Sequence, residues 1–269
     1  MQDALNDFHY DPKALSSPVA QRKIYRNKLM LTHLTGFGGG VSGAAGTSYL
    51  FDGSNDALTS PDHADWILGG GSGAFTVDAW INFSDLDGLF FGMEEDNDNR
   101  YDCYFHGTRG MQFHEIDSTS VNINENVGNL DGWSTGTWFH VAIIRGWGGV
   151  ADDWAFTKDG ATVHTFSNSS TIGNHTYTFG IGATLQGGLN GYMDEFRLSN
   201  VARWTADFSA SLPTVEYTSD ANTQLLIHCN ETIVSGTTGS GATFVDSGNT
   251  GHTMTEVNQI IRTSAQYKF

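Results

Sequence analysis

Short stretches of alternating apolar and polar residues dominate the chain from residue 47 onward. The clearest is FTVDAWINF, in which Phe75, Val77, Ala79, Ile81 and Phe83 alternate with more polar or amphipathic residues. Because successive side chains of a strand point to opposite faces, this pattern predicts a strand with one buried face. About twelve such stretches, mostly bounded by glycine, predict an all-β sandwich. One short helical turn is expected inside it, at residues 199–208.

The first 46 residues follow a different pattern, and we expect them to form an extended arm with a linker. SSPVAQRKIYRNKLM, residues 16–30, predicts a short helix with Ser17 as N-cap and Pro18 as its first residue. GFGGGVSGAAG, residues 36–46, is typical of a glycine-rich hinge or turn-rich loop. We therefore divide the chain into an arm and linker, 1–46, and a sandwich, 47–269.

The charge of the chain restricts its partners. The formal net charge is −17 over 269 residues, so nucleic acid and anionic membranes are not expected partners. Basic residues gather before residue 29 instead, and Arg22, Lys23, Arg26 and Lys28 predict that the arm docks onto another protein. The sequence has no signal-peptide pattern and no run of about 20 apolar residues. We therefore expect synthesis in a cytoplasm and no membrane span.

A series of motifs in fixed order resembles the laminin-G-like domains of the concanavalin A-like class. The motifs are YLFDGSNDAL, GAFTVDAWI, GTWFHVAIIR, FTKDGATV and LNGYMDEFRLSNVARW, within about residues 48–212. The resemblance implies a jelly-roll β-sandwich of two antiparallel sheets. Members of this family bind glycans or proteins, or serve as structural modules. The ending RWTADF is similar to versions of the domain in phage and bacterial surface proteins.

The order of the C-terminal motifs departs from the family pattern. TQLLIHCN, FVDSGNTGHTMT and IIRTSAQYKF, within residues 223–269, resemble the strands and turn that usually open such a domain. They could pair with SYLFDG of the same chain or with the domain of a neighbouring subunit. An unpaired strand would be an aggregation hazard, so these strands must be covered. Of the two arrangements, we favour closure within the chain.

Asp194 is a candidate metal ligand because of its apolar neighbours. Continuous alternation through GYMDEFRLS would place it on one face with Tyr192, Phe196 and Leu198. A carboxylate on such a face must be hydrogen-bonded, charge-paired or metal-bound. The resemblance implies a calcium site with Asp52 and Asp56 as partners, and calcium takes 6–8 oxygen ligands. The alternative is that Asp194 caps loop N–H groups or pairs with Arg197 or Arg203. In either case we expect it to tie the first and last strands together.

Two acidic motifs are further candidates, one for a calcium loop and one for a glycosidase active site. Asp96 and Asp98 resemble the start of a calcium loop, but Arg100 stands at the next ligand position, which favours a solvated loop. FHEIDST is similar to the paired-acid motif of sandwich glycosidases, with Glu115 and Asp117 at the first two positions. The third position falls on Thr or Ser, which cannot act as the general acid, so we expect no enzymatic activity.

Other side chains give weaker signals. Four tryptophans near predicted loops are candidates for stacking on sugar rings: Trp66, Trp133, Trp147 and Trp154. Such rings more often fill the end of a sandwich. Cys103 and Cys229 are the only cysteines, and two buried thiols are favoured over a disulfide. His140 matches a position that is often histidine in the family and is expected to be structural.

Three functions compete on these observations. The favoured one is a non-enzymatic virion structural protein, a capsid decoration or tail component, present in many copies or as a homo-oligomer. Its arm would dock onto other virion proteins, and its sandwich would face outward. The second is a free-standing module that binds cell-surface glycans, which can coexist with the first. The third, a glycoside hydrolase, is disfavoured. Calcium is the one cofactor considered.

Overall fold

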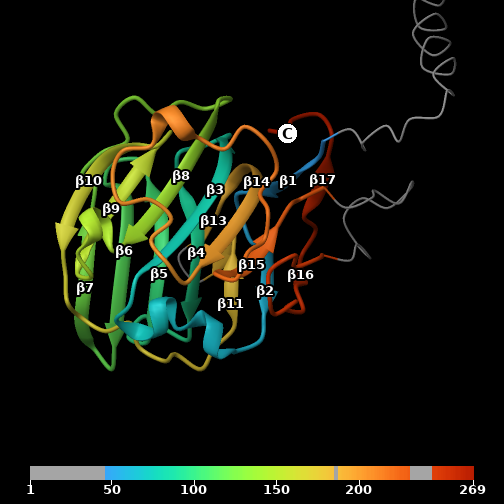
Figure 1. Cartoon of the computed structure of the whole chain (residues 1–269). Helices are drawn as coiled ribbons and strands as arrows, with labels where there is room; N and C mark the ends of the chain where they lie inside the picture. Colours follow the sequence, from blue (N-terminus) through green and yellow to red (C-terminus); the bar gives the residue numbers. More distant parts are fainter. Residues whose placement is uncertain (1–45, 185–186, 231–243) are drawn as a thin grey trace, which may run out of the picture. The chain divides into compact units, whose positions relative to one another are not determined.

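Two antiparallel β-sheets pack face to face in a computed structural model, which describes residues 46–184, 187–230 and 244–269 (Figure 1). The two sheets confirm the predicted all-β, concanavalin A-like jelly-roll sandwich. The helix expected at 16–30 and the basic residues Arg22, Lys23, Arg26 and Lys28 lie outside the described residues.

The first sheet has eight strands. Their order is β10-β9-β8-β3-β14-β1-β17, and β15 pairs with β14 beside this path. The bounds are β1 Ser48–Asp52, β3 Phe75–Phe83, β8 Trp138–Arg145, β9 Asp153–Lys158, β10 Ala161–Ser167, β14 Asn190–Ser199, β15 Thr223–Ile227 and β17 Ile261–Thr263. Strands from the two ends of the described chain therefore lie in one sheet.

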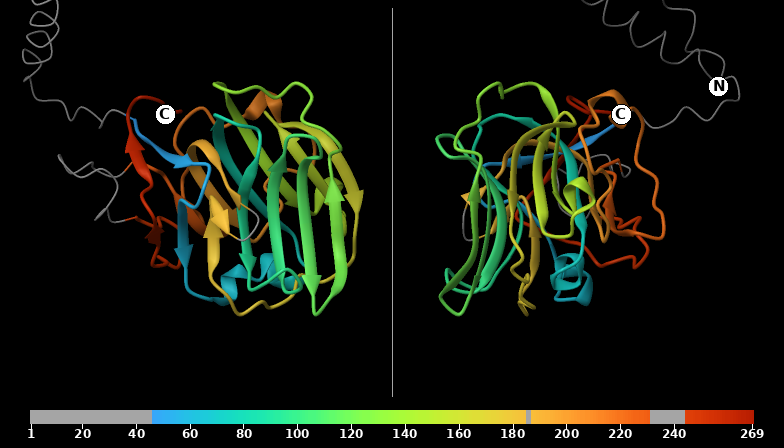
Figure 2. Two further views of the ribbon diagram at one scale, coloured as in Figure 1. Left: turned by 180° about the vertical axis from the view of Figure 1, so that it is seen from behind. Right: turned by 60° about the vertical axis from the view of Figure 1, so that its left-hand side comes forward.

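The second sheet has seven strands in the order β16-β2-β11-β4-β5-β6-β7, seen from its outer side in the left view of Figure 2. Its strands are β2 Ala57–Ser60, β4 Gly88–Glu94, β5 Arg100–His106, β6 Gly110–Asp117, β7 Ser120–Asn126, β11 Phe179–Ile181 and β16 Thr255–Val257. A two-stranded sheet joins β12 Ala183–Thr184 to β13 Gly187–Gly188.

Helical structure in the described part of the chain is limited to short 3-10 turns. These are η2 Ala64–Trp66, η3 Leu68–Gly71, η4 Trp147–Gly149 and η5 Ser209–Ser211. Within the described ranges, then, helices are too short to cross a membrane. The helical turn expected at 199–208 is wrong. The Thr76 hydroxyl bonds to the Val201 carbonyl and to the Arg203 N–H, both at 2.9 Å, and so holds this backbone against β3 instead.

The predicted strand FTVDAWINF is observed as β3, which lies in the middle of the core. Its predicted apolar face, from Phe75 to Phe83, is buried against the second sheet. The opposite sheet contributes Phe90, Phe91, Phe105 and Phe113 to the same cluster. Cys103 and Cys229 are both buried and form no disulfide, which confirms the two-thiol interpretation.

The C-terminal strands complete the sheets of their own chain. β17 pairs antiparallel with β1, with Ser48 opposite Thr263 and Leu50 opposite Ile261. β15 pairs with β14, and β16 pairs with β2. This is the closure within the chain favoured from the sequence, and it leaves the TQLLI strand without a free apolar edge.

Ile260 tests this closure because it carries the C-terminal segment into the core. Its side chain is fully buried, whereas its neighbour Ile261 is 40% exposed. We expect Ile260→Ala to lower the free energy of unfolding by about 2–4 kcal/mol, as for other large-to-small core changes. Urea unfolding monitored by tryptophan fluorescence measures this.

The matched control is Ile261→Ala, which should change stability by less than about 1 kcal/mol. Equal effects of the two substitutions would contradict the closure of residues 260–263 onto β1.

Candidate functional site

Asp194 lies where β14 changes its pairing. Residues before it pair with β1, and residues after it pair with β15, on the same edge of β14. The register with β3 shifts between Asp194 and Arg197, and Glu195 has a φ of 55°. This is a β-bulge, which moves the following side chains to the other face. Met193 on one side of the bulge and Phe196 on the other therefore both face the core.

The bulge corrects the sequence prediction for this strand. Asp194 does not share the core face with Phe196 and Leu198, because alternation is interrupted at Glu195. Asp194 instead faces outward beneath the C-terminal segment, where it accepts a 2.9 Å hydrogen bond from the Lys268 backbone N–H. Burial raises the pKa of Asp194 to about 8, against the opposing effect of this hydrogen bond. It caps backbone N–H groups, which was the alternative to calcium.

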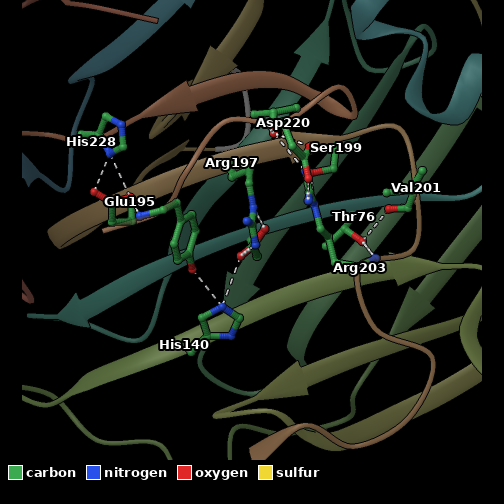
Figure 3. Close-up of polar contacts among 12 residues, drawn as sticks. Thr76, His140, Glu195, Arg197, Ser199, Val201, Arg203, Asp220 and His228 are labelled. Atoms are coloured by element: carbon green, nitrogen blue, oxygen red, sulfur yellow. Dashed lines mark hydrogen bonds and ion pairs between the residues drawn. The ribbon is translucent and has the colours of Figure 1, made fainter. Parts of the chain in front are cut away.

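A buried ion pair occupies the outer face of the eight-stranded sheet (Figure 3). Arg197 donates to both carboxylate oxygens of Asp78, at 3.0 and 2.9 Å. His140 Nε2 lies 3.2 Å from the same carboxylate and 3.0 Å from the hydroxyl of Tyr217. Burial alone would raise the pKa of Asp78, but Arg197 and His140 lower it to about 2. His140 thus has the structural position expected of it.

Two further pairs bind the segment 200–222 to this face. Glu195 accepts from the Tyr217 backbone N–H at 2.7 Å, and His228 Nδ1 lies 2.8 Å from its other oxygen. Burial raises the pKa of Glu195 in spite of these contacts. Arg203 forms a bidentate pair with Asp220, and these hydrogen bonds hold the pKa of Asp220 well below its usual range. Glu195 is buried and Asp220 is exposed, and both carboxylates are paired with groups of the chain itself.

The three predicted calcium ligands do not meet at one point. Asp52 and Asp56 share a turn, where Asp56 accepts from the backbone N–H groups of Asp52 and Gln259. Asp52 is opposite Asn190 in the register, four residues from Asp194. At about 3.3 Å per residue, that separates them by roughly 13 Å. One ion cannot contact all three carboxylates in this arrangement.

The predicted sugar-stacking tryptophans are mostly in the interior. Trp66, Trp133 and Trp154 are buried in the main core cluster, so that prediction is wrong for these three. Trp147 lies at η4 and packs against a smaller cluster with Phe208. The rings fill gaps between strands and loops, which is the more common use of tryptophan in a sandwich.

The acids of the glycosidase-like motif are also separated. Glu115 points between the sheets, is fully buried, and accepts from the Gly173 N–H at 2.9 Å with His175 Nε2 at 3.2 Å. Asp117 is exposed at the end of β6. The two carboxylates therefore do not face a common open surface.

The open surface of the sandwich is the outer side of the seven-stranded sheet. One register row across it consists of Thr255, Thr59, Gly180, Gly92, Asp102, His114 and Asn124. Their chain neighbours, such as Phe179 and Cys103, face the core, so the row faces outward. Gly180 and Gly92 are adjacent and form a glycine strip between Thr59 and Asp102, and both glycines are buried, so the strip itself is shielded from solvent. Three strand spacings make this strip about 14 Å wide.

Polar side chains in fixed positions line one side of the strip. The buried carboxylate of Asp102 accepts from Arg100 Nε at 2.6 Å and lies 3.0 Å from His114 Nδ1. The ring of Tyr104 is 5.3 Å from that of His114. Beside Tyr104 in the register, the amide oxygen of Gln112 is buried and has no hydrogen-bond partner among the described residues. Asp102 and Gln112 are buried, and the part-exposed rings of Tyr104 and His114 reach the surface beside them.

A hollow of about 340 Å³ lies on the other side of the strip. It is lined by Thr59, Glu94, Tyr177, Thr178, Gly180, Ala183 and Val257. Tyr177 is 48% exposed, so its ring is open to a ligand. The volume is within the range of small-ligand sites. We call the combined surface the outer polar face, defined by Thr59, Glu94, Arg100, Asp102, Tyr104, Gln112, His114 and Tyr177.

The sequence prediction missed the outer polar face, although a signal was present. RYDCYFH alternates Arg100, Asp102 and Tyr104 with core residues, and MQFHEI places Gln112 and His114 similarly. Polar and aromatic residues on the outward face of neighbouring strands predict a solvated face of an antiparallel sheet. From the sequence alone, Arg100 indicates only that the acidic stretch before it is not a calcium loop.

Known proteins share this fold at low sequence identity. A family model described as the concanavalin A-like lectin/glucanases superfamily matches residues 52–207, more than half of the chain. No curated protein matches the sequence. A Bacteroides ovatus protein proposed to bind carbohydrate has a TM-score of 0.56 and 15% identity, over 82% of this chain and 60% of that one.

Two other solved structures show weaker similarity. The heptameric SAP-like pentraxin of Limulus polyphemus has a TM-score of 0.48 and 17% identity, over 81% of this chain and 94% of that one. Domains LG4-5 of the mouse laminin alpha1 chain have a TM-score of 0.43 and 13% identity, over 61% and 45%.

Asp194 should make stability depend on pH. Because its pKa rises from 3.8 to about 8 in the folded state, the folded chain holds a proton that the unfolded chain has released between these values. This contribution is complete below about pH 4 and is lost as the pH rises towards about 8. We expect Asp194→Asn to flatten that fall, measured by melting midpoints from about pH 5 to about pH 9.

Asp85→Asn is the control, because Asp85 is exposed in a loop. The explanation fails if the difference between the wild type and Asp194→Asn is the same at every pH.

Proposed function

Because this chain belongs to the concanavalin A-like lectin/glucanases superfamily, we propose that it is a non-enzymatic glycan-binding module. The ligand would lie across the outer polar face. The observation that carries this proposal is the hollow lined by half-exposed Tyr177, which lies beside Gly180 and across Gly92 from the Asp102 cluster. Glycine inside a strand often marks the close approach of a ligand or another backbone.

Gly92 also has a reason within the sheet. A Cβ atom there would lie 2.9 Å from the Tyr101 carbonyl oxygen, so a larger residue would shift β5. The case for a ligand therefore depends on what surrounds the strip as well. An aromatic ring at Tyr177 stands at one edge, and hydrogen-bonding groups at Asp102 and His114 stand at the other.

This combination suits a neutral sugar. A pyranose has an apolar face that stacks on an aromatic ring and equatorial hydroxyls that bond to carboxylate, imidazole and amide groups. On this face Arg100 offsets the charge of Asp102 and leaves that of Glu94, and the whole chain has a net charge of −17. An acidic glycan would be repelled, so a neutral one is favoured.

The position of Glu115 supports the non-enzymatic assignment. A retaining glycosidase needs two carboxyl groups about 5–5.5 Å apart beside the substrate. Glu115 is turned inward onto Gly173 and His175, and Asp117 lies at the hairpin. Those acids are therefore not arranged on the outer polar face.

A role in a virion is a second proposal and has sequence support only. Arg22, Lys23, Arg26 and Lys28 in the arm could dock onto an acidic surface of another virion protein, while the sandwich displays its glycan site. Multiple copies would raise the avidity of a weak sugar site. The solution mass of the full chain, compared with a chain lacking residues 1–46, tests the arm as an assembly device.

Tyr177 provides the test of the glycan site. We expect the full chain to bind one or more neutral glycans on an array, and Tyr177→Ala to weaken that binding by about tenfold or more, as for loss of an aromatic stacking partner. Calorimetric titration with the best array ligand measures the change.

Tyr267→Ala is the matched control, since Tyr267 is 46% exposed but lies in the C-terminal segment. Both variants should melt close to the wild type. Absence of binding to every neutral glycan, or equal losses in the two variants, would refute the assignment of this face.

A further inference from the structure

Three potential metal ligands meet between η2 and the C-terminal segment, away from the outer polar face. They are His63, the N-cap of η2, Asp65 within η2, and His252 in the turn before β16. One ring nitrogen of each histidine and one carboxylate oxygen all lie within 4.8 Å of one another. Asp65 Oδ2 is 3.0 Å from His252 Nε2 and 3.4 Å from His63 Nδ1.

The two separations that involve Asp65 Oδ2 are close to those of a tetrahedral site. Metal–ligand distances of about 2.0–2.1 Å place tetrahedral ligand atoms about 3.3 Å apart. Nδ1 of His63 also accepts a 3.1 Å hydrogen bond from the Asp65 backbone N–H. A bound ion would replace that bond at Nδ1, or would use Nε2 after a flip of the ring.

The shared carboxylate is held by outer hydrogen bonds. Thr250 Oγ1 donates to Asp65 Oδ2 at 2.7 Å, and the Gln224 amide donates to Oδ1 at 3.1 Å. Such partners orient a ligand before the ion arrives. They come from the turn before β16 and from β15, so the site is built from three parts of the chain distant in sequence.

The turn that carries His252 is itself fixed. Asp246 Oδ2 accepts from the His252 backbone N–H at 2.7 Å, and Oδ1 accepts from Leu226 and Gly248. The His252 ring packs against buried Trp66, with centroids 4.3 Å apart. One ligand is therefore held in place by the core.

The opposite side of the cluster is open. The His63 side chain is 44% exposed, whereas those of Asp65 and His252 are 20% and 5% exposed. An ion can enter past His63, and water can fill a fourth position. Two imidazoles and one carboxylate suit zinc and its neighbours in the first transition series, not calcium, which prefers oxygen ligands alone.

We propose that His63, Asp65 and His252 bind a divalent transition-metal ion of the zinc class, with a fourth position open to solvent. The ion would connect the loop after β2 to the turn before β16, residues 187 positions apart in the chain. It would thereby stabilise the closure of the C-terminal segment onto the sandwich. This proposal is independent of glycan binding.

The experiment uses the untagged full chain, stripped with chelator and titrated with ZnCl₂ by calorimetry. Co²⁺ in place of Zn²⁺ reports the ligand geometry through its visible absorption. We expect binding at one site to require His63, and a rise in melting temperature with ZnCl₂, because an ion that binds only the folded chain stabilises it. His63→Gln should weaken Zn²⁺ binding at least about tenfold, and Thr250→Val about tenfold.

His106→Gln is the matched control, because His106 is a part-exposed histidine in the β5–β6 hairpin outside the cluster. It should bind Zn²⁺ as the wild type does. His63→Gln should keep the melting temperature of the metal-free chain, because its side chain is largely exposed. A chain that binds no Zn²⁺, or a His63→Gln variant with unchanged affinity and unchanged zinc-induced stabilisation, would overturn the proposal.

Discussion

The buried ion pair between Asp78 and Arg197 controls how the eight-stranded sheet is covered. Removing two charges from water costs several kcal/mol for each ion, and the cost is offset only when geometry and hydrogen bonds are complete. Arg197 meets both oxygens of Asp78, and its guanidinium stacks 4.1 Å from the ring centroid of Tyr217. Tyr217 belongs to the covering segment. The ion pair keeps its geometry only when residues 200–222 lie over it. These residues are in turn held partly by their contacts with the ion pair.

Because these segments cover one sheet only, the outer faces of the two sheets differ in their roles. The outer face of the eight-stranded sheet is buried under residues 200–222 and the C-terminal segment, so its polar side chains act in folding. The outer face of the seven-stranded sheet carries the Tyr177 hollow and polar side chains held by hydrogen bonds. The seven-stranded sheet therefore carries the exposed hollow, and on the eight-stranded sheet Asp78, Arg197 and Glu195 are paired beneath the covering segments.

Period-two alternation was enough to find the strands and the sandwich, because each core strand repeats it over several residues. It could not find the bulge at Glu195, because a glutamate with positive φ has no signal in its residue type. Strands of three or four residues, such as β2 and β16, are too short to show the two-residue alternation. Trp80, on the polar side of FTVDAWINF, was a sign that this side is covered as well. The His63 cluster joins residues too distant in sequence for any spacing rule.

The described chain starts and finishes at one corner of the sandwich. A Cβ atom at Gly46 would overlap the Phe269 carbonyl oxygen, and Ser48 lies opposite Thr263 where the chain enters β1 and leaves β17. A force applied through residues 46 and 269 would therefore pull this pair of strands apart from one end. Hydrogen bonds in that geometry break one after another and do not share the load. The sandwich would yield at low force along this axis, from the C-terminal side, while the seven-stranded sheet stayed intact.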